Sequence, residues 1–261
     1  MNIIKFISRY IHYFLIAKNE HAIHGPFVFE FINKVLYKKN QDEDCMLINS
    51  LRKDLCRSKK VITITDFGAG SKINKSNRRK VKDIAKNSSK NSKFGKLLYR
   101  MVKFYKPKNI VELGTSLAIS TCYLAKANTK GRVFTFEGCT ETAKIAKQNL
   151  QKLDIDNTEI TLGDFNKTVN QKLEKIETID FAFIDGNHQE APTINYFKEC
   201  LKYSNNNTLF VFDDIHWSQG MENAWKSIKE HPKTTVTIDL FFIGIVFIKK
   251  ELSKENFTIR F

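Results

Sequence analysis

Short apolar runs alternate with helical stretches in the second half of the chain, and this rhythm limits the possible folds more than any other feature. The runs are Asn109–Leu113, Val133–Phe136, Glu159–Leu162, Ile179–Ile184 and Thr208–Phe212. Helical patterns lie between them, for example at Ile119–Ala127, Thr140–Leu153 and Pro192–Tyr203. Repeated strand–helix units predict a parallel sheet with helices on both faces.

The two ends of the chain depart from this rhythm. "TTVTIDLF" and "FIGIVFIKK" leave no room for a helix between them, so they predict an antiparallel hairpin, and "NFTIRF" is a candidate edge strand. Residues 1–60 have helical patterns, broken at "HGPF" by Pro26. We therefore expect a Rossmann-like, mostly parallel seven-stranded sheet with a terminal antiparallel hairpin and an N-terminal helical extension. The predicted parts are a helical cap over 1–60, a short strand and a basic lid over 61–93, and an α/β domain over 94–261.

Charge is concentrated in one segment. The chain has a formal net charge of +15, and Lys72–Lys96 holds ten Lys and Arg residues against the single acid Asp83. Such a field favours anionic partners, although a solvated basic face without a partner is the alternative. The apolar residues of the first helix recur at helical spacing, so it either covers the domain or lies on a membrane surface. The odd number of cysteines, five, and the absence of C-x-x-C indicate a reducing, cytoplasmic setting.

Two glycine loops compete for the role of nucleotide loop. "VITITDFGAGSK" (61–72) has more glycines, but a polar stretch follows it and no second strand ends about 20 residues later. "NIVELGTSLAIST" (109–121) is followed by an apolar helix start and by the strand that ends at Glu137. Acids also follow the next strands, and this series is Glu112, Glu137, Asp164 and Asp185. Because such positions line one edge of a parallel sheet, the second loop is the predicted cofactor loop. "DFGAGS" is then a turn that leads into the basic lid.

The chemistry of this loop points to one cofactor class. The loop has one glycine where a dinucleotide site needs G-x-G-x-x-G, and the chain contains no G-x-x-x-x-G-K-[ST]. Few glycines and several acids suit a cationic ligand without phosphates, such as S-adenosylmethionine.

At this point the chain resembles a known family. "VELGTSLAIST" is similar to the first motif of class I S-adenosylmethionine-dependent methyltransferases of the catechol type, E-[IL]-G-T-x-x-G-x-S-T, with Ala118 in place of the usual Gly. "FGKLLYRMV", "FAFIDGNH" and "FVFDDIHW" resemble the preceding helix and the fourth and fifth strand ends. The resemblance implies a methyltransferase domain over 94–261. It places the methionine end at Glu112, Gly114, Thr115 and Ser116, the ribose at Glu137, and the adenine at Asp164 and Phe165, with Gly138 and Asp185 completing the set.

Methyl transfer to oxygen requires a nucleophilic hydroxyl on the acceptor, and a divalent metal lowers the pKa of such a hydroxyl. Asp185, Asp213 and Asp214 follow neighbouring strands, and the resemblance makes them metal ligands, for magnesium in particular; helix capping is the alternative. His188 and His216 lie beside these acids and are candidates, with Asp185, for the catalytic base, and either histidine is also a candidate additional ligand.

The predicted function is O-methylation of a small-molecule or sugar-like hydroxyl. RNA ribose 2′-O-methylation, favoured by the charge, and a non-catalytic cofactor-binding module, suggested by Ala118, are the alternatives. Besides a small-molecule acceptor, the sequence leaves nucleic acid, an anionic membrane surface and a second copy of the chain open as partners.

Overall fold

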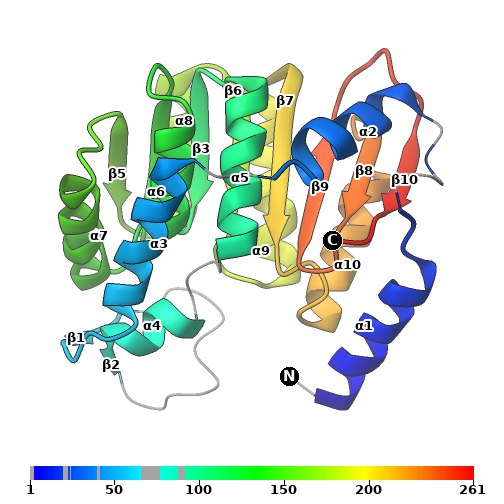
Figure 1. The fold of residues 1–261 in the computed structure, drawn as a ribbon. Coiled ribbons are helices and arrows are strands. Elements are labelled where there is room, and N and C mark those ends of the chain that lie inside the picture. Colours follow the sequence, from blue (N-terminus) through cyan, green and yellow to red (C-terminus); the bar gives the residue numbers. More distant parts are fainter. Residues whose placement is uncertain (1–2, 20–22, 24, 40–41, 66–76, 88–91) are drawn as a thin grey trace. The chain divides into compact units, whose positions relative to one another are not determined.

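The computed structural model describes residues 3–19, 23, 25–39, 42–65, 77–87 and 92–261 (Figure 1). Its contacts divide the chain into two compact units, one made of residues 1–33 and 173–261 and the other of residues 34–172. We call them the outer unit and the cofactor-loop unit, and describe each by itself. The helix α8 (Phe165–Ile176) and the π-helix η2 (Ile32–Leu36) run across the boundary in sequence. Among the described residues, no helix is long and apolar enough to cross a membrane.

The cofactor-loop unit contains three parallel strands of the main sheet. β3 (Asn109–Leu113), β4 (Arg132–Glu137) and β5 (Thr158–Leu162) pair in that order, with Glu112 opposite Thr135. The helices α6 (Ile119–Ala127) and α7 (Thr140–Lys152) connect them. The strands follow the predicted apolar runs closely, since the branched and aromatic side chains of β3 and β4 are almost all buried.

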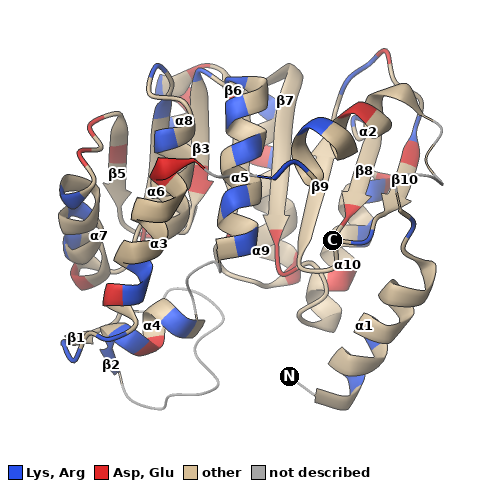
Figure 2. Cartoon of the chain, in the orientation of Figure 1, with Lys and Arg blue, Asp and Glu red and all other residues tan. Residues whose placement is uncertain are grey.

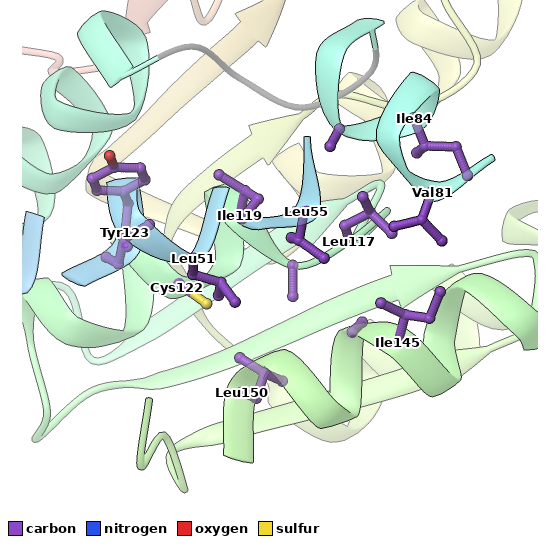
Figure 3. Close-up of a cluster of buried hydrophobic side chains, with 14 of the residues drawn as sticks. Leu51, Leu55, Val81, Ile84, Leu117, Ile119, Cys122, Tyr123, Ile145 and Leu150 are labelled. Carbon is purple, nitrogen blue, oxygen red and sulfur yellow. The ribbon is translucent and has the colours of Figure 1, made fainter. Parts of the chain in front are cut away.

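The same unit holds the helices α3 (Glu43–Leu55), α4 (Val81–Asn87) and α5 (Ser92–Tyr105) and a small antiparallel pair, β1 (Val61–Thr63) with β2 (Arg78–Lys80). Figure 3 shows Val81 and Ile84 of α4 turned toward a cluster that includes Leu55, Leu117 and Ile145. The described part of the predicted lid is therefore β2, which pairs with β1, and α4, whose apolar residues pack against the loop after β3. The "DFGAGS" turn and residues 72–76 and 88–91 lie outside the described residues, so the lid stays a prediction.

The outer unit contains the other strands. Their order is β10 (Glu255–Thr258), β8 (Val236–Asp239), β9 (Ile243–Phe247), β7 (Ser204–Asp213) and β6 (Ile179–Ile184). β6 pairs parallel with β7, whereas β9 is antiparallel to both β7 and β8. The helices are α1 (Ile3–Ile16), α2 (Pro26–Phe31), α9 (Glu190–Lys202) and α10 (Gln219–Glu230), and Figure 1 shows α2 in front of this part of the sheet and α10 behind it.

The predicted fold class is confirmed as a mostly parallel Rossmann-like sheet with a terminal antiparallel hairpin, β8–β9. The described strands of this sheet number eight where seven were predicted. The additional strand is β10, the candidate edge strand "NFTIRF", which pairs parallel with β8. β10 forms because one edge of β8 is available for pairing with the last residues of the chain. The local residue pattern does not show that this edge is available, so the pairing could not be predicted from it.

Candidate functional site

The loop between β3 and α6 has the compact backbone that a close ligand approach requires. Gly114 has φ of 108°, which only glycine adopts easily, and Ser116 and Ala118 have φ of 49° and 62°. The N–H groups of Gly114 and Thr115 donate to the carbonyl of Phe136 on β4 at 3.1 and 3.0 Å. The loop is therefore fixed to the end of the neighbouring strand before any ligand binds.

Glu137, at the end of β4, joins this loop to the next one. Its Oε2 accepts from the N–H of Ser116 at 2.8 Å, and its Oε1 accepts from the N–H of Cys139 at 2.8 Å. Burial raises the pKa of Glu137 above its usual range, and the hydrogen bonds from Cys139, Ser116 and Gly138 oppose that shift. Each carboxylate oxygen has a second lone pair, so this residue can also accept from a ligand's hydroxyl groups.

Glu112 lies beneath the loop and is fully buried. Its Oε2 accepts from the hydroxyls of Thr121 at 2.5 Å and Thr135 at 2.7 Å, while Oε1 has no hydrogen-bond partner among the described residues. Burial raises the pKa of Glu112 to about 7, against the effect of the nearby Ser120, Thr121 and Thr135 hydroxyls. A buried carboxylate oxygen without a partner is costly, and a cation or N–H donor would relieve that cost.

A short chain of hydroxyl groups links the loop to Glu112, and sequence reasoning did not find it. The Oγ1 atoms of Thr115 and Thr135 are 2.7 Å apart, and Thr135 donates in turn to Glu112. Because the proton of Thr135 points to the carboxylate, Thr115 is the donor between the two threonines. The signal for Thr135 was the parallel register of β3 and β4, which sets it opposite Glu112. A one-strand pattern does not contain that information.

Asp164 and Phe165 stand where β5 gives way to α8. Asp164 Oδ1 accepts from the N–H of Asn166 at 3.0 Å, and its carbonyl accepts from the N–H groups of Lys167 and Thr168. This arrangement satisfies the first N–H groups of α8, as a helix N-cap does. The half-buried ring of Phe165 lies edge-on to Phe136, with ring centroids 6.4 Å apart, and Phe136 is the residue whose carbonyl holds the cofactor loop.

The outer unit brings together a different set of charged groups. Ligand atoms of Asp185, His188 and Asp213 all lie within 4.8 Å of one another, and His188 Nε2 is 3.7 Å from Asp185 Oδ1. Asp185 follows β6 and Asp213 ends β7, so the parallel pairing of these strands places the two acids side by side. Two carboxylates and one imidazole are a donor set that a divalent cation accepts. The residues present therefore fit a metal.

Asp214, the third predicted metal ligand, is not in this group. Its φ is 53°, its N–H donates to the carbonyl of Phe242 at 2.7 Å, and its own carbonyl accepts from Trp217. The backbone turns at this point into the segment before α10. In the described structure His188 stands in the group where the sequence placed Asp214.

His216 lies between two acids of its own unit. Its Nε2 is 2.8 Å from Asp239 Oδ2, its Nδ1 is 3.2 Å from Glu222 Oε1, and Phe241 stacks on its ring. Burial by itself would lower the pKa of His216, but the bonds and charges of Asp239 and Glu222 outweigh it and raise the pKa. Both ring nitrogens of His216 are bonded to acids of the fold. This geometry favours a structural imidazolium over a base that takes a proton from a substrate.

Comparison with known proteins agrees with this arrangement. A family described as a methyltransferase domain matches residues 111–215, from β3 to the turn after β7. The predicted resemblance to class I methyltransferases is confirmed.

Individual relatives and solved structures resemble the chain over defined shares of its length. Catechol O-methyltransferases of Niastella koreensis and Mycobacterium tuberculosis are 32% and 26% identical, each over 46% of this chain and over 55% and 54% of their own lengths. The chain thus spans about half the length of the curated relatives that it matches. The O-methyltransferase from Bacillus cereus in complex with SAH covers 85% of this chain and 97% of its own, at a TM-score of 0.56 and 22% identity, and shares its fold.

Proposed function

We propose that this protein transfers the methyl group of S-adenosylmethionine to the hydroxyl of a small molecule, with a divalent metal. The observation that carries the cofactor part is Glu112, a fully buried carboxylate with an unpartnered oxygen beneath a glycine turn. The similarity to catechol O-methyltransferases over residues of the same segment supports the choice of reaction.

In this proposal different residues of the cofactor-loop unit bind different parts of S-adenosylmethionine. Ionised Glu112 and the backbone of Gly114–Ser116 bind the methionine end, whose ammonium and sulfonium are cationic. Glu137 and Gly138 bind the ribose hydroxyls, and Asp164 with the ring of Phe165 binds the adenine. The hydrogen bonds from Ser116 and Cys139 hold Glu137 in place, so its orientation is fixed before the cofactor arrives.

The outer unit supplies the groups for the acceptor. Asp185, His188 and Asp213 would hold the metal, which, when bound, lowers the pKa of the acceptor hydroxyl and orients it. Imidazole is an uncommon partner for Mg²⁺ and a common one for transition metals, so we expect Mn²⁺ to bind at least as well.

The transfer itself is an in-line displacement. The acceptor oxygen forms a bond to the methyl carbon while the carbon–sulfur bond breaks, and the electron pair of that bond stays on sulfur. The hydroxyl proton leaves to solvent or to a neighbouring base. The products are a methyl ether and S-adenosylhomocysteine, so atoms and charge balance. The protein's part is positioning and nucleophile formation.

The five cysteines are free thiols, four of them buried. This usage supports a reducing, cytoplasmic setting as part of the same proposal.

Calorimetric titration with S-adenosylmethionine, followed by methyl transfer to a panel of catechols, tests the proposal. We expect binding without metal, and turnover that EDTA abolishes and Mn²⁺ or Mg²⁺ restores. Asp185→Asn should remove metal-dependent turnover, whereas Asp156→Asn, at an exposed acid before β5, should not. No heat from folded protein at millimolar cofactor overturns the proposal. Cofactor binding with methyl transfer to RNA ribose instead of small molecules overturns the acceptor part alone.

A further inference from the structure

The first helix of the chain has an apolar face that is largely exposed to solvent. α1 is apolar over most of its length, and the exposed side chains of this face are large. The exposed fractions are 65% at Ile3, 78% at Ile4, 51% at Ile7, 54% at Ile11 and 76% at Leu15. Large apolar patches of this kind mark interaction surfaces. Figure 1 shows α1 at the margin of the outer unit, near the chain's C-terminus.

The opposite face of α1 is firmly attached to its own unit. Tyr13 is buried and donates from its hydroxyl to the carbonyl of Ile259 at 2.6 Å. The ring of Phe6 lies edge-on to Phe241 at 5.3 Å, and Arg9 pairs with Glu222 at 2.8 Å. Phe6, Arg9 and Tyr13 recur at helical spacing, so this face is fixed inward. The exposed isoleucines and Leu15 are therefore held outward by the fold itself.

Basic side chains border the outward face of α1, and the acid Glu255 lines a hollow with Ile16 and Lys18 at the C-terminal end of the helix. α1 contains no acidic residue, and exposed Lys5 and Lys18 lie in or directly after it. Arg260, also exposed, lies over the ring of Phe14, with its guanidinium carbon 4.2 Å from the ring centroid. Figure 2 shows α1 with basic bands and no acidic ones. An apolar stripe bordered by cations fits a surface that is apolar beneath and anionic at its rim.

We propose that α1 docks this protein on an anionic lipid surface. Its exposed isoleucines and Leu15 enter the boundary between headgroups and acyl chains, and Lys5, Lys18 and Arg260 meet the lipid phosphates. A second copy of the chain is the less suitable occupant, because two chains with a net charge of +15 each repel one another, whereas an anionic bilayer attracts both. This inference does not depend on the proposed enzymatic function.

Flotation of the full chain with vesicles tests the docking surface. With phosphatidylcholine vesicles that contain about 30 mol% phosphatidylglycerol, we expect the protein to float with the lipid, and to bind at least about tenfold less to phosphatidylcholine alone. Ile4→Asp/Leu15→Asp should reduce binding to the anionic vesicles by about tenfold or more, since it places charge in the apolar stripe. Met46→Asp/Leu47→Asp is the matched control, because it makes the same charge change at exposed apolar residues of α3. It should bind within about threefold of the parent chain.

Circular dichroism and thermal unfolding show whether each variant is folded, and Ile4→Ser/Leu15→Ser replaces the aspartate variant if that one is not. Equal losses in the α1 and α3 variants would mean diffuse charge attraction and would overturn the proposal. So would a failure of the parent chain to bind anionic vesicles. Light scattering provides the third arm: a dimer that the α1 variant converts to monomer would assign the surface to a second copy.

Discussion

The carboxylate of Glu137, the last residue of β4, accepts a hydrogen bond of 2.8 Å from the main-chain N–H of Ser116, which lies in the loop after β3. The other oxygen holds Cys139 in the same way. One side chain thus organises both loops that the proposal assigns to the cofactor. Its removal should affect the fold and the ligand together.

We expect Glu137→Ala to lower the free energy of unfolding by about 1–3 kcal/mol, because it leaves two N–H groups without their acceptor. Affinity for S-adenosylmethionine should fall by about a hundredfold or more, since the ribose acceptor is also lost. Urea denaturation and calorimetry measure the two effects. Glu141→Ala removes an acid of α7 that pairs with Lys144 at the surface, and should leave the urea midpoint of the parent chain unchanged. An unchanged cofactor affinity in Glu137→Ala would contradict the assignment of this residue to the ribose.

Cofactor affinity should depend on pH through Glu112. Burial raises the pKa of this carboxyl to about 7, and a cationic ligand needs the ionised form. Affinity should therefore fall by about tenfold for each pH unit below 7, and binding near pH 6 should release a proton. Calorimetry in buffers of different ionisation enthalpy measures both quantities. Glu112→Gln should bind weakly at every pH with no proton release, and a pH dependence retained in this variant would rule out Glu112 as its source.

The same raised pKa has a consequence for the unliganded protein. Because the native state holds this proton more tightly than the unfolded chain, the contribution of Glu112 to stability declines as pH rises from about 4.5 to about 7. Glu112→Gln should remove that decline. Urea denaturation at pH 5 and pH 8, in the absence of cofactor, distinguishes the two curves.

Some elements were predictable from the sequence because their residues alone select them. β3 and β6 have the predicted bounds, since buried parallel strands have continuous apolar runs. β2 was not predicted, because its sequence, Arg-Arg-Lys, has no strand pattern and it forms by pairing with β1. α4 was also missed: it is short and lies within the most basic segment, and its apolar face is visible only against the loop after β3.

The candidate site shows the same division. The acids at the strand ends were predictable, since the carboxyl ends of parallel strands lie at the same edge of the sheet. Which of these acids come together could not be predicted. The loop after β6 brings His188 to Asp185 and Asp213. The backbone of Asp214 instead turns at a hydrogen bond from its N–H to the carbonyl of Phe242, the residue before β9. The role of His216 likewise depends on Asp239, 23 residues later.

The backbone at Ala118 predicts how substitutions there behave. The residue has φ of 62° and ψ of 24° as the N-cap of α6, and its methyl group is fully buried in the hydrophobic cluster that includes Leu117 and Ile119. Ala118→Gly should relieve about 1 kcal/mol of left-handed strain and lose about 0.8 kcal/mol of methyl burial, so its stability should stay within about 0.5 kcal/mol of the parent.

Ala118→Val should instead lower stability by more than about 2 kcal/mol, because a β-branched residue resists this conformation and overfills the cluster. Urea denaturation of both variants checks the balance. A loss above about 2 kcal/mol in the glycine variant would show that methyl packing, and not backbone strain, dominates at this position.

His216 should stabilise the protein in a pH-dependent way. Asp239 and Glu222 raise its pKa above the usual value, so the native state binds this proton more tightly than the unfolded chain does. The resulting stabilisation is fully present below about pH 6.5 and is lost as pH rises through the higher folded-state pKa. His216→Gln should cost about 2–3 kcal/mol at pH 6, where it leaves the buried Asp239 without its charged partner, and less at pH 9. Exposed His12→Gln on α1 is the control and should change stability by less than about 0.5 kcal/mol at either pH. Urea denaturation at both pH values measures the difference, and a cost for His216→Gln that is the same at pH 6 and pH 9 would mean that the imidazole is held as a neutral ring.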